Sequence, residues 1–240
     1  MILITRPIEE ATILADELKQ KEIQTHIEPL IYFKNKKVKY DFTNPSNYIV
    51  SSIRAVQSIK DNNLLPKILM QKNQFFVVGK KVAEALYSIG TDKIENHFLN
   101  SALLTEFIEK NNINNPFVYL CSNNVNEDMI LSFKEMNKPL EQVILYETIP
   151  SQRLKPQTIK LISDTLINSV VLYSLFTAET FLKLIRRSNL QEHTKNFYYY
   201  CLSKRIAEFM IDNGFKNVFF SPISEQKALI NLINSRVNCK

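Results

Sequence analysis

Short polar and basic residues follow the apolar runs of this chain, and their chemistry favours an anionic ligand. They are Thr5, Arg6, Ser52, Gly79, Lys80, Ser122, Ser174, Ser203 and Lys204. In a parallel sheet these positions fall at the carboxyl ends of the strands, where ligands of open α/β sheets bind. The free N–H groups and the dipoles of the helices that begin there also favour negative charge. We therefore predict that these residues bind carboxylate groups.

For two pairs of these residues the sequence leaves a second, structural role open. Ser52 and Ser174 each precede a helix-like stretch, and a serine in that place often caps the helix. Lys80 and Lys204 follow a turn, so they could equally be solvated residues of a first helical turn.

Motifs of the common catalytic classes are absent from the sequence. It contains no GxGxxG or GxxxxGK[ST] nucleotide loop, no GxSxG nucleophile elbow and no HExxH metal motif. The three histidines have neither ligand nor triad spacing, and Cys121, Cys201 and Cys239 form no CxxC pair. We therefore expect no metal, no cofactor and no disulfide framework.

The elements that would position the polar residues occur twice. Residues 76–90 (FVVGKKVAEALYSIG) and 200–214 (YCLSKRIAEFMIDNG) lie 124 positions apart, and each reads as a strand, a turn, a helix and a terminal glycine. Residues 48–56 (YIVSSIRAV) and 170–178 (VVLYSLFTA) form a second pair, 122 positions apart. This alternation predicts two similar α/β units, each with a parallel sheet of the flavodoxin-like kind.

A third, weaker pair predicts that one unit is inserted in the other. Residues 2–18 (ILITRPIEEATILADEL) resemble residues 117–133 (FVYLCSNNVNEDMILSF), so this segment opens one unit and closes the other. We therefore expect domain one to comprise residues 1–33 and 148–240, and domain two to be the insertion 34–147. A cleft between the two domains is also expected.

Two extended, apolar segments are predicted to connect the domains. HIEPLIYF at 26–33 and EQVILYETIP at 141–150 lie where the chain would leave domain one and return to it. A pair of antiparallel strands suits such a double crossing. The basic run KNKKVK at 34–39 is interpreted as part of an exposed linker.

Composition and charge limit the class of protein. Hydrophobic residues make up 45% of the chain, enough for two cores, yet no apolar run approaches the ~18 residues of a membrane span. The charged N-terminus does not resemble a signal peptide, so we expect a cytoplasmic monomer that does not bind membranes. The net charge of +6 fits an anionic ligand or a lysine-rich surface, and no basic tract interleaved with aromatics predicts nucleic-acid binding.

Several short motifs follow one another in a set order along nearly the whole chain. They are ITRP at 4–7, PLI at 29–31, SSIRAV at 51–56, VGKKVAEAL at 78–86, LYETIP at 145–150, LYS at 172–174, LSKRIAEFM at 202–210 and SP at 221–222. In this order and spacing the chain resembles the uroporphyrinogen-III synthase family. The resemblance implies a cofactor-free cyclising lyase of haem biosynthesis.

The resemblance also implies a substrate and a reaction. The substrate is hydroxymethylbilane, a linear octacarboxylate tetrapyrrole, and loss of its hydroxyl gives an azafulvene-type cation. Closure at the substituted carbon of the last pyrrole gives a spiro intermediate, which reopens with that ring inverted. Tyr146 matches the return-strand tyrosine of the family, and it is our candidate for the proton donor to the departing hydroxyl. Packing within the linker strands is its alternative role.

Some positions depart from the family pattern. The family often has threonine where this chain has Val82 and Ile206, glycine where it has Ser203, and asparagine where it has Arg54. These departures keep a second hypothesis open, in which the chain is a non-catalytic homologue or a two-lobed module that binds an acidic small molecule.

Overall fold

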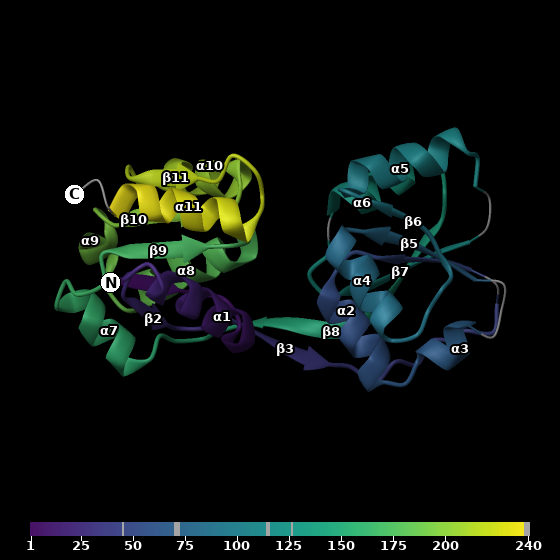
Figure 1. Ribbon diagram of the computed structural model, residues 1–240, viewed down its shortest axis with the longest axis horizontal. Helices are drawn as coiled ribbons and strands as arrows, with labels where there is room; N and C mark the ends of the chain where they lie inside the picture. Colours follow the sequence, from purple (N-terminus) through teal and green to yellow (C-terminus); the bar gives the residue numbers. More distant parts are fainter. Residues whose placement is uncertain (45, 70–72, 114–115, 126, 238–240) are drawn as a thin grey trace. The chain divides into compact units, whose positions relative to one another are not determined.

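The structure, a computed structural model, describes residues 1–44, 46–69, 73–113, 116–125 and 127–237. The chain divides into two compact units (Figure 1). Unit 1 comprises Met1–Tyr32 with Ile149–Lys240, and unit 2 is Phe33–Thr148. The boundaries that the sequence suggests, after residues 33 and 147, each differ from these by one residue.

Unit 1 is built on a sheet of five parallel strands in the order β11-β10-β9-β1-β2. The strands are β1 (Ile2–Ile4), β2 (Thr25–Ile27), β9 (Ser169–Leu172), β10 (Tyr198–Cys201) and β11 (Val218–Phe220). Numbered along the unit, this is the order 2-1-3-4-5 of flavodoxin-like folds. The predicted fold class is therefore confirmed for this unit.

Helices cover both faces of the unit 1 sheet. They are α1 (Ile8–Lys19), α7 (Pro156–Ser163), α8 (Leu175–Arg187), α9 (Gln191–Thr194), α10 (Lys204–Asp212) and α11 (Gln226–Val237). Because side chains alternate along a strand, Ile2 and Ile4 of β1 pack with α1 and α11, while Leu3 packs with α7, α8 and α10. The unit is thus a three-layer α/β/α sandwich with a core on each side of the sheet (Figure 1).

Unit 2 contains a six-stranded sheet in the order β3-β8-β7-β4-β5-β6. The strands are β3 (Ile31–Asn35), β4 (Asn47–Val50), β5 (Gln74–Val78), β6 (Ile94–Phe98), β7 (Phe117–Ser122) and β8 (Leu140–Pro150). The pairs from β8 to β6 are all parallel. The edge strand β3 runs antiparallel to β8, since Lys36 N–H donates to Leu145 O (2.9 Å) while Ser151 N–H donates to Leu30 O (2.8 Å). An antiparallel pair was expected for these connecting segments.

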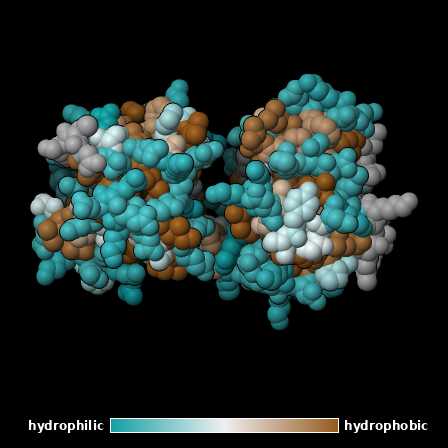
Figure 2. All heavy atoms as spheres, in the orientation of Figure 1, coloured by the Kyte–Doolittle hydropathy of each residue, from teal (hydrophilic) through white to brown (hydrophobic). Residues whose placement is uncertain are grey.

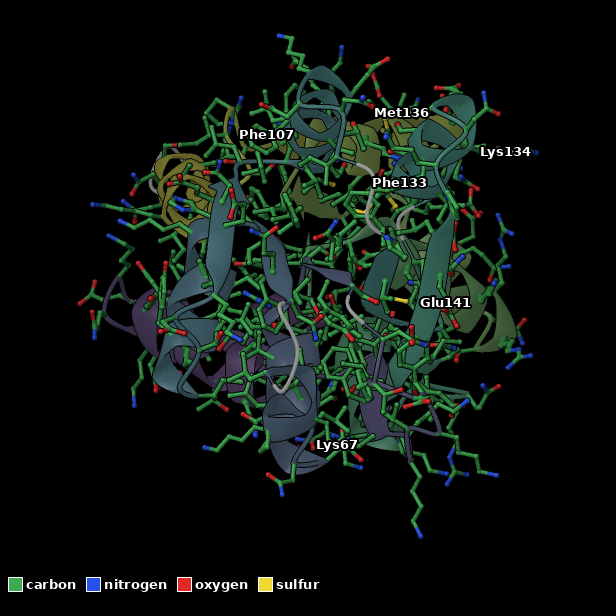
Figure 3. All side chains as sticks on the ribbon, turned by 90° about the vertical axis from the view of Figure 1, so that its right-hand side faces the viewer. Lys67, Phe107, Phe133, Lys134, Met136 and Glu141 are labelled. Carbon is green, nitrogen blue, oxygen red and sulfur yellow. The ribbon has the colours of Figure 1, made fainter. Side chains whose placement is uncertain are left out.

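Helices also cover both faces of the unit 2 sheet. They are α2 (Ile53–Asp61), α3 (Leu65–Leu69), α4 (Lys80–Ser88), α5 (Ser101–Lys110) and α6 (Glu127–Glu135). Tyr48 and Val50 pack with α2, α3 and α4, whereas Ile49 packs with α5 and α6. Figure 3 shows the amphipathic character of α6, with Phe133 inside this layer and Lys134 at its rim.

The strand registers reproduce the internal repeat that the sequence predicts. Aligned neighbours on three strands are Tyr198, Ser169 and Ile2 in unit 1 and Gln74, Asn47 and Phe117 in unit 2. These matched positions differ by 124, 122 and 115 residues, which are the offsets of the three sequence pairs. β7 and β1 therefore occupy the same place in the two sheets, although β1 opens unit 1 and β7 comes late in unit 2.

Glycines end the two repeated helices, as predicted. Gly90 after α4 and Gly214 after α10 have φ of +102° and +89°, the left-handed conformation that favours glycine at this position. The turns before the helices differ. Gly79 has φ of +97°, whereas Ser203 has φ of −140°, an extended conformation that serine adopts without strain.

Two expectations concern thiols and membranes. Cys121 and Cys201 are free and buried, and Cys239 lies outside the described residues. Within the described ranges, no helix has both the length and the apolar character needed to cross a membrane. The face in Figure 2 carries mostly hydrophilic residues, with an apolar area over part of α5, where Leu103 is 41% exposed.

Candidate functional site

A pocket of about 440 Å³ opens at the carboxyl edge of the unit 2 sheet. Its polar lining includes Ser51 and Ser52 after β4, Tyr119 and Ser122 of β7, Asn100 before α5, and Tyr146 of β8. Strand order reverses here, because β5 and β6 follow on one side of β4 while β7 and β8 lie on the other. Such a switch point is where open α/β sheets bind ligands.

Three predicted site residues, Ser52, Ser122 and Tyr146, line this pocket. The Tyr146 hydroxyl lies 3.0 Å from Ser52 Oγ. Ser52 Oγ also accepts the N–H of Ala55 at 3.0 Å, which caps α2. The capping role that the sequence left open for Ser52 is therefore present, and it coexists with a place in the pocket.

An irregularity in β8 orients Tyr146. Along the β7–β8 pair, Cys121 is opposite Ile144, but Ser122 is opposite Tyr146, so one extra residue is accommodated in β8. Leu145 and Tyr146 consequently both pack in the core on the α2 and α4 side of the sheet, which a regular alternation of side chains would not allow. The Tyr146 ring also packs edge-on against Phe33, with 5.7 Å between the ring centroids.

The Tyr146 phenol is protonated at neutral pH. Burial raises its pKa above the ordinary value of about 10, and the hydrogen bond with Ser52 acts in the opposite direction. A neutral phenol can donate a proton to a departing hydroxyl, so the geometry and the charge state both suit a general acid.

Sequence reasoning missed a second hydroxyl pair in the pocket. Ser51 Oγ and the Tyr119 hydroxyl lie 2.6 Å apart, and burial raises the pKa of Tyr119 as well. Ser51 stands beside Ser52 in the same motif, so its place at a strand end was available as a signal. Tyr119 lies within a buried strand and had no such signal.

The remaining groups of the pocket are neutral. Burial raises the pKa of the Cys121 thiol to about 12, so the group is no thiolate at neutral pH. Ser122 Oγ donates to Asn124 O (2.8 Å) and accepts Asn124 N–H (3.1 Å), which closes a turn. Asn100 caps α5 by accepting Leu103 N–H at 3.0 Å. The N-terminal ends of α2 and α5 thus both face this edge and favour an anionic ligand.

Two predicted residues of unit 2 do not join the pocket lining. Gly79 N–H donates to Phe98 O at 2.7 Å within the sheet edge. Lys80 is 77% exposed and lies 3.9 Å from Glu84 on the surface of α4. Neither contact points to a ligand.

In unit 1, Thr5 and Arg6 are engaged inside the protein. The buried Thr5 hydroxyl donates to Val171 O at 2.7 Å. Arg6 forms an ion pair with Glu10, donates to Gln226 Oε1 (2.7 Å) and lies 4.0 Å from the centroid of the Tyr173 ring. These contacts give both residues a structural role.

The other predicted residues of unit 1 lie at the ends of β9 and β10. Ser174 caps α8 by accepting Thr177 N–H at 3.1 Å, so its alternative role is also present. Ser203 precedes α10 but makes no capping hydrogen bond with its side chain. Lys204 is 72% exposed, 3.5 Å from Glu208.

Comparison with known proteins agrees with this architecture. A family model described as uroporphyrinogen-III synthase HemD matches residues 13–231. The structure is similar to a crystal structure of uroporphyrinogen-III synthetase from Helicobacter pylori 26695, at 16% identity over 98% of each chain with a TM-score of 0.69. It is also similar to a mutant uroporphyrinogen III synthase from the extremely thermophilic bacterium Thermus thermophilus, at 10% identity over 99% of this chain and 98% of that one, with a TM-score of 0.66. No curated protein matches the sequence. The likenesses to solved structures show the fold, and the match of the family model shows that the chain belongs to the uroporphyrinogen-III synthase family.

Proposed function

We propose that this chain converts hydroxymethylbilane to uroporphyrinogen III and that the pocket of unit 2 holds the end of the bilane that loses its hydroxyl. The family is one of cyclising lyases in haem biosynthesis, and hydroxymethylbilane is its substrate class. The observation that carries the proposed location is the buried Tyr146 hydroxyl, 3.0 Å from Ser52 Oγ in a pocket of neutral groups. A pocket of about 440 Å³ suits one end of a tetrapyrrole.

In the proposed first step, Tyr146 gives its proton to the hydroxyl of the bilane. The C–O bond breaks, water departs, and an azafulvene-type cation remains. Closure onto the substituted carbon of the last pyrrole and reopening of the spiro intermediate then invert that ring. Reopening leaves a second azafulvene-type cation on the neighbouring pyrrole, which closes the macrocycle by bonding to the free α-carbon of the inverted ring. The proton then lost from that carbon restores the aromatic pyrrole and returns to the phenolate, so water is the only net loss.

The protein supplies orientation in addition to the proton. Ser52 holds the phenol oxygen, and Phe33 packs against its ring, so both the position and the direction of the hydroxyl are fixed. Holding the two ends of a flexible bilane in a reactive arrangement can supply several kcal/mol without further acid–base groups. This accounts for a site without a metal motif or a nucleophile.

For unit 1 we propose direct substrate contacts for fewer residues than the sequence suggested. Ser203, whose hydroxyl does not cap α10, and the exposed Lys204 are proposed to contact further carboxylates of the substrate. Ser174 keeps its capping hydrogen bond and could contact a ligand with the same oxygen. Thr5 and Arg6 are proposed to shape this edge through their neighbours.

The direct test supplies enzymatically made hydroxymethylbilane and separates the type I and type III isomers by chromatography. We expect type III uroporphyrinogen from the intact chain and type I from bilane alone. A non-catalytic homologue would bind the bilane and leave the isomer ratio at that of the uncatalysed reaction. A cytoplasmic monomer without a nucleic-acid partner stays a prediction, and light scattering of the purified chain would test the oligomeric state.

A further inference from the structure

Arg54 carries a charged group that has no polar partner among the described residues. It is the second residue of α2, two positions after Ser52 and the pocket edge. Its Nε is buried and makes no hydrogen bond, and none of the ion pairs among the described residues includes its guanidinium. Buried donors are nearly always bonded in folded proteins, so an arginine with unused donors beside a site requires an explanation.

One acidic residue within electrostatic reach of Arg54, Asp61, is held by other groups. Asp61 lies on the same helix, and the charge of Arg54 helps to lower its pKa, after hydrogen bonding by Gln57. Its two carboxylate oxygens accept from Gln57 Nε2 and Asn35 Nδ2, each at 2.6 Å. Asp61 therefore does not neutralise Arg54 by direct contact.

Arg54 is positioned by an aromatic residue that also contacts Tyr146. The guanidinium carbon lies 4.9 Å from the centroid of the Phe33 ring, and Phe33 packs edge-on against Tyr146. The charge of Arg54 acts on the pKa of Tyr146 in the lowering direction, although burial is the larger influence and raises it. A guanidinium that lies over a ring keeps the N–H groups along its edge free for a carboxylate.

The local structure does not favour a cation at this position. The first turn of α2 contains no acidic residue, and the N-terminal end of a helix carries a partial positive charge of its own. Arg54 therefore adds positive charge where the helix already repels it. An anion would be attracted by both.

We propose that Arg54 binds one of the carboxylates of the tetrapyrrole and so fixes the reacting end of the substrate beside Tyr146. This inference rests on the proposed function and deepens it. Arginine and carboxylate can form two parallel hydrogen bonds, which set direction as well as distance. The family often has asparagine at this position, so in this chain the contact would depend on charge.

The experiment compares Arg54→Gln and Arg54→Lys with a matched control, Lys60→Gln, in the full chain. Lys60 is exposed in the last turn of the same helix, so its substitution removes the same charge from the far end of α2. Steady-state turnover of hydroxymethylbilane gives KM and kcat, and anaerobic calorimetry with uroporphyrinogen III gives the affinity for product.

For Arg54→Gln we expect KM to rise about tenfold, with kcat nearly unchanged and product binding weakened by a similar factor. Arg54→Lys should recover part of the affinity, because it keeps the charge but loses the paired geometry. Lys60→Gln should match the unsubstituted chain. The salt dependence of KM should also become less steep for Arg54→Gln only.

Two results would overturn the inference. Unchanged KM and product affinity in Arg54→Gln, with a lower unfolding temperature, would make Arg54 a packing group on Phe33. Equal losses in Arg54→Gln and Lys60→Gln would make the effect one of net charge. If the unsubstituted chain binds uroporphyrinogen III but does not turn over the bilane, the proposed function fails, and weaker product binding by Arg54→Gln would still support the role of Arg54.

Discussion

The two units share one sheet plan, but the switch points of their sheets are occupied differently. Where the repeat places Arg6 and Tyr173 in unit 1, unit 2 has Cys121 and Ser51. The large pair is stacked at 4.0 Å, whereas the small pair lines a pocket of about 440 Å³. A duplicated fold can therefore keep its strand registers while the side-chain volume at two positions distinguishes a packed edge from an open one.

The two carboxyl edges also differ in whether their charged groups are compensated by partners within the protein. In unit 1, Arg6 is bound by Glu10 and Gln226, and Gln226 in turn donates to Glu17, so charge is compensated within the protein. In unit 2 the pocket is lined by neutral hydroxyls, and the nearby Arg54 has no polar partner among the described residues. The carboxyl edge of unit 2 therefore carries polar groups and a positive charge that are available to bind a ligand.

The largest expected effect on the difference between the two units comes from removing the hydroxyl of Tyr146. Tyr146→Phe keeps the ring against Phe33 and deletes only the proposed proton donor. We expect kcat to fall about 100-fold, the lower range for general acid catalysis, with the unfolding temperature little changed. Tyr119→Phe is the matched control, because its hydroxyl contacts Ser51 in the same pocket. Near-normal turnover of Tyr146→Phe with full type III selectivity would eliminate the proton-donor role.

The pH profile of the unsubstituted chain gives a second measure of Tyr146. Because burial raises its pKa, the phenol stays protonated below the ordinary value of about 10. As an acid it should therefore keep kcat level from pH 7 to about pH 9, and the rate should fall only as the phenol ionises at higher pH. A loss of rate in Tyr146→Phe that does not change the high-pH limb would assign that limb to another group.

The backbone at the repeated turns offers a comparison of stability. Gly79→Ala introduces a side chain at φ of +97°, where we expect a cost of about 2 kcal/mol, although the added methyl meets only Val82 at 3.6 Å. Ser203→Ala should cost almost nothing, because Ser203 is extended and its side chain does not cap the helix. Urea unfolding measures both. Equal losses at the two turns would show that their conformations are alike in solution.

Much of the fold was predictable because it depends on local patterns. Strand, turn and helix follow one another within each repeat, and Gly90 and Gly214 take the left-handed conformation that their place after a helix requires. Ser52, Ser122 and Tyr146 meet in one pocket because parallel strands end at one edge. Ser52 and Ser122 could therefore be found from strand ends alone, whereas Tyr146 lies within β8 and was proposed from the resemblance to the family.

What could not be predicted depends on contacts between distant parts of the sequence. The hydrogen bond of Arg6 to Gln226 joins residues 220 positions apart, and that of Thr5 to Val171 joins residues 166 apart. With these partners Thr5 and Arg6 stabilise the fold, whereas the sequence predicted that they bind the ligand. The extra residue in β8 that buries Tyr146 is likewise a matter of pairing with β7, which composition does not reveal.

Arg6 provides a test of the packed edge in unit 1. Arg6→Gln removes the ion pair with Glu10 and the contact over Tyr173, and we expect about 1–2 kcal/mol of lost stability with little change in kcat. Arg187→Gln is the control, because it removes an arginine from the exposed end of α8. A large rise in KM without a loss of stability would mean that Arg6 binds substrate after all, and the contrast between the two edges would fail.

The turn lysines give the smallest expected effect and compare the two units directly. Lys80 and Lys204 occupy equivalent positions, and each lies near a glutamate four residues on, at 3.9 Å and 3.5 Å. Lys110 is a suitable control, since it pairs with Glu106, is 71% exposed and lies in the last turn of α5, away from the carboxyl edge.

If the edges attract an anionic substrate, Lys80→Glu and Lys204→Glu should each raise KM about two- to threefold at low salt, because exposed charges act weakly and are screened. The effect should vanish at high salt, and Lys110→Glu should not show it. Equal changes at all three lysines would identify the turn lysines as ordinary surface residues, and a larger change at Lys80 than at Lys204 would assign more of the attraction to unit 2.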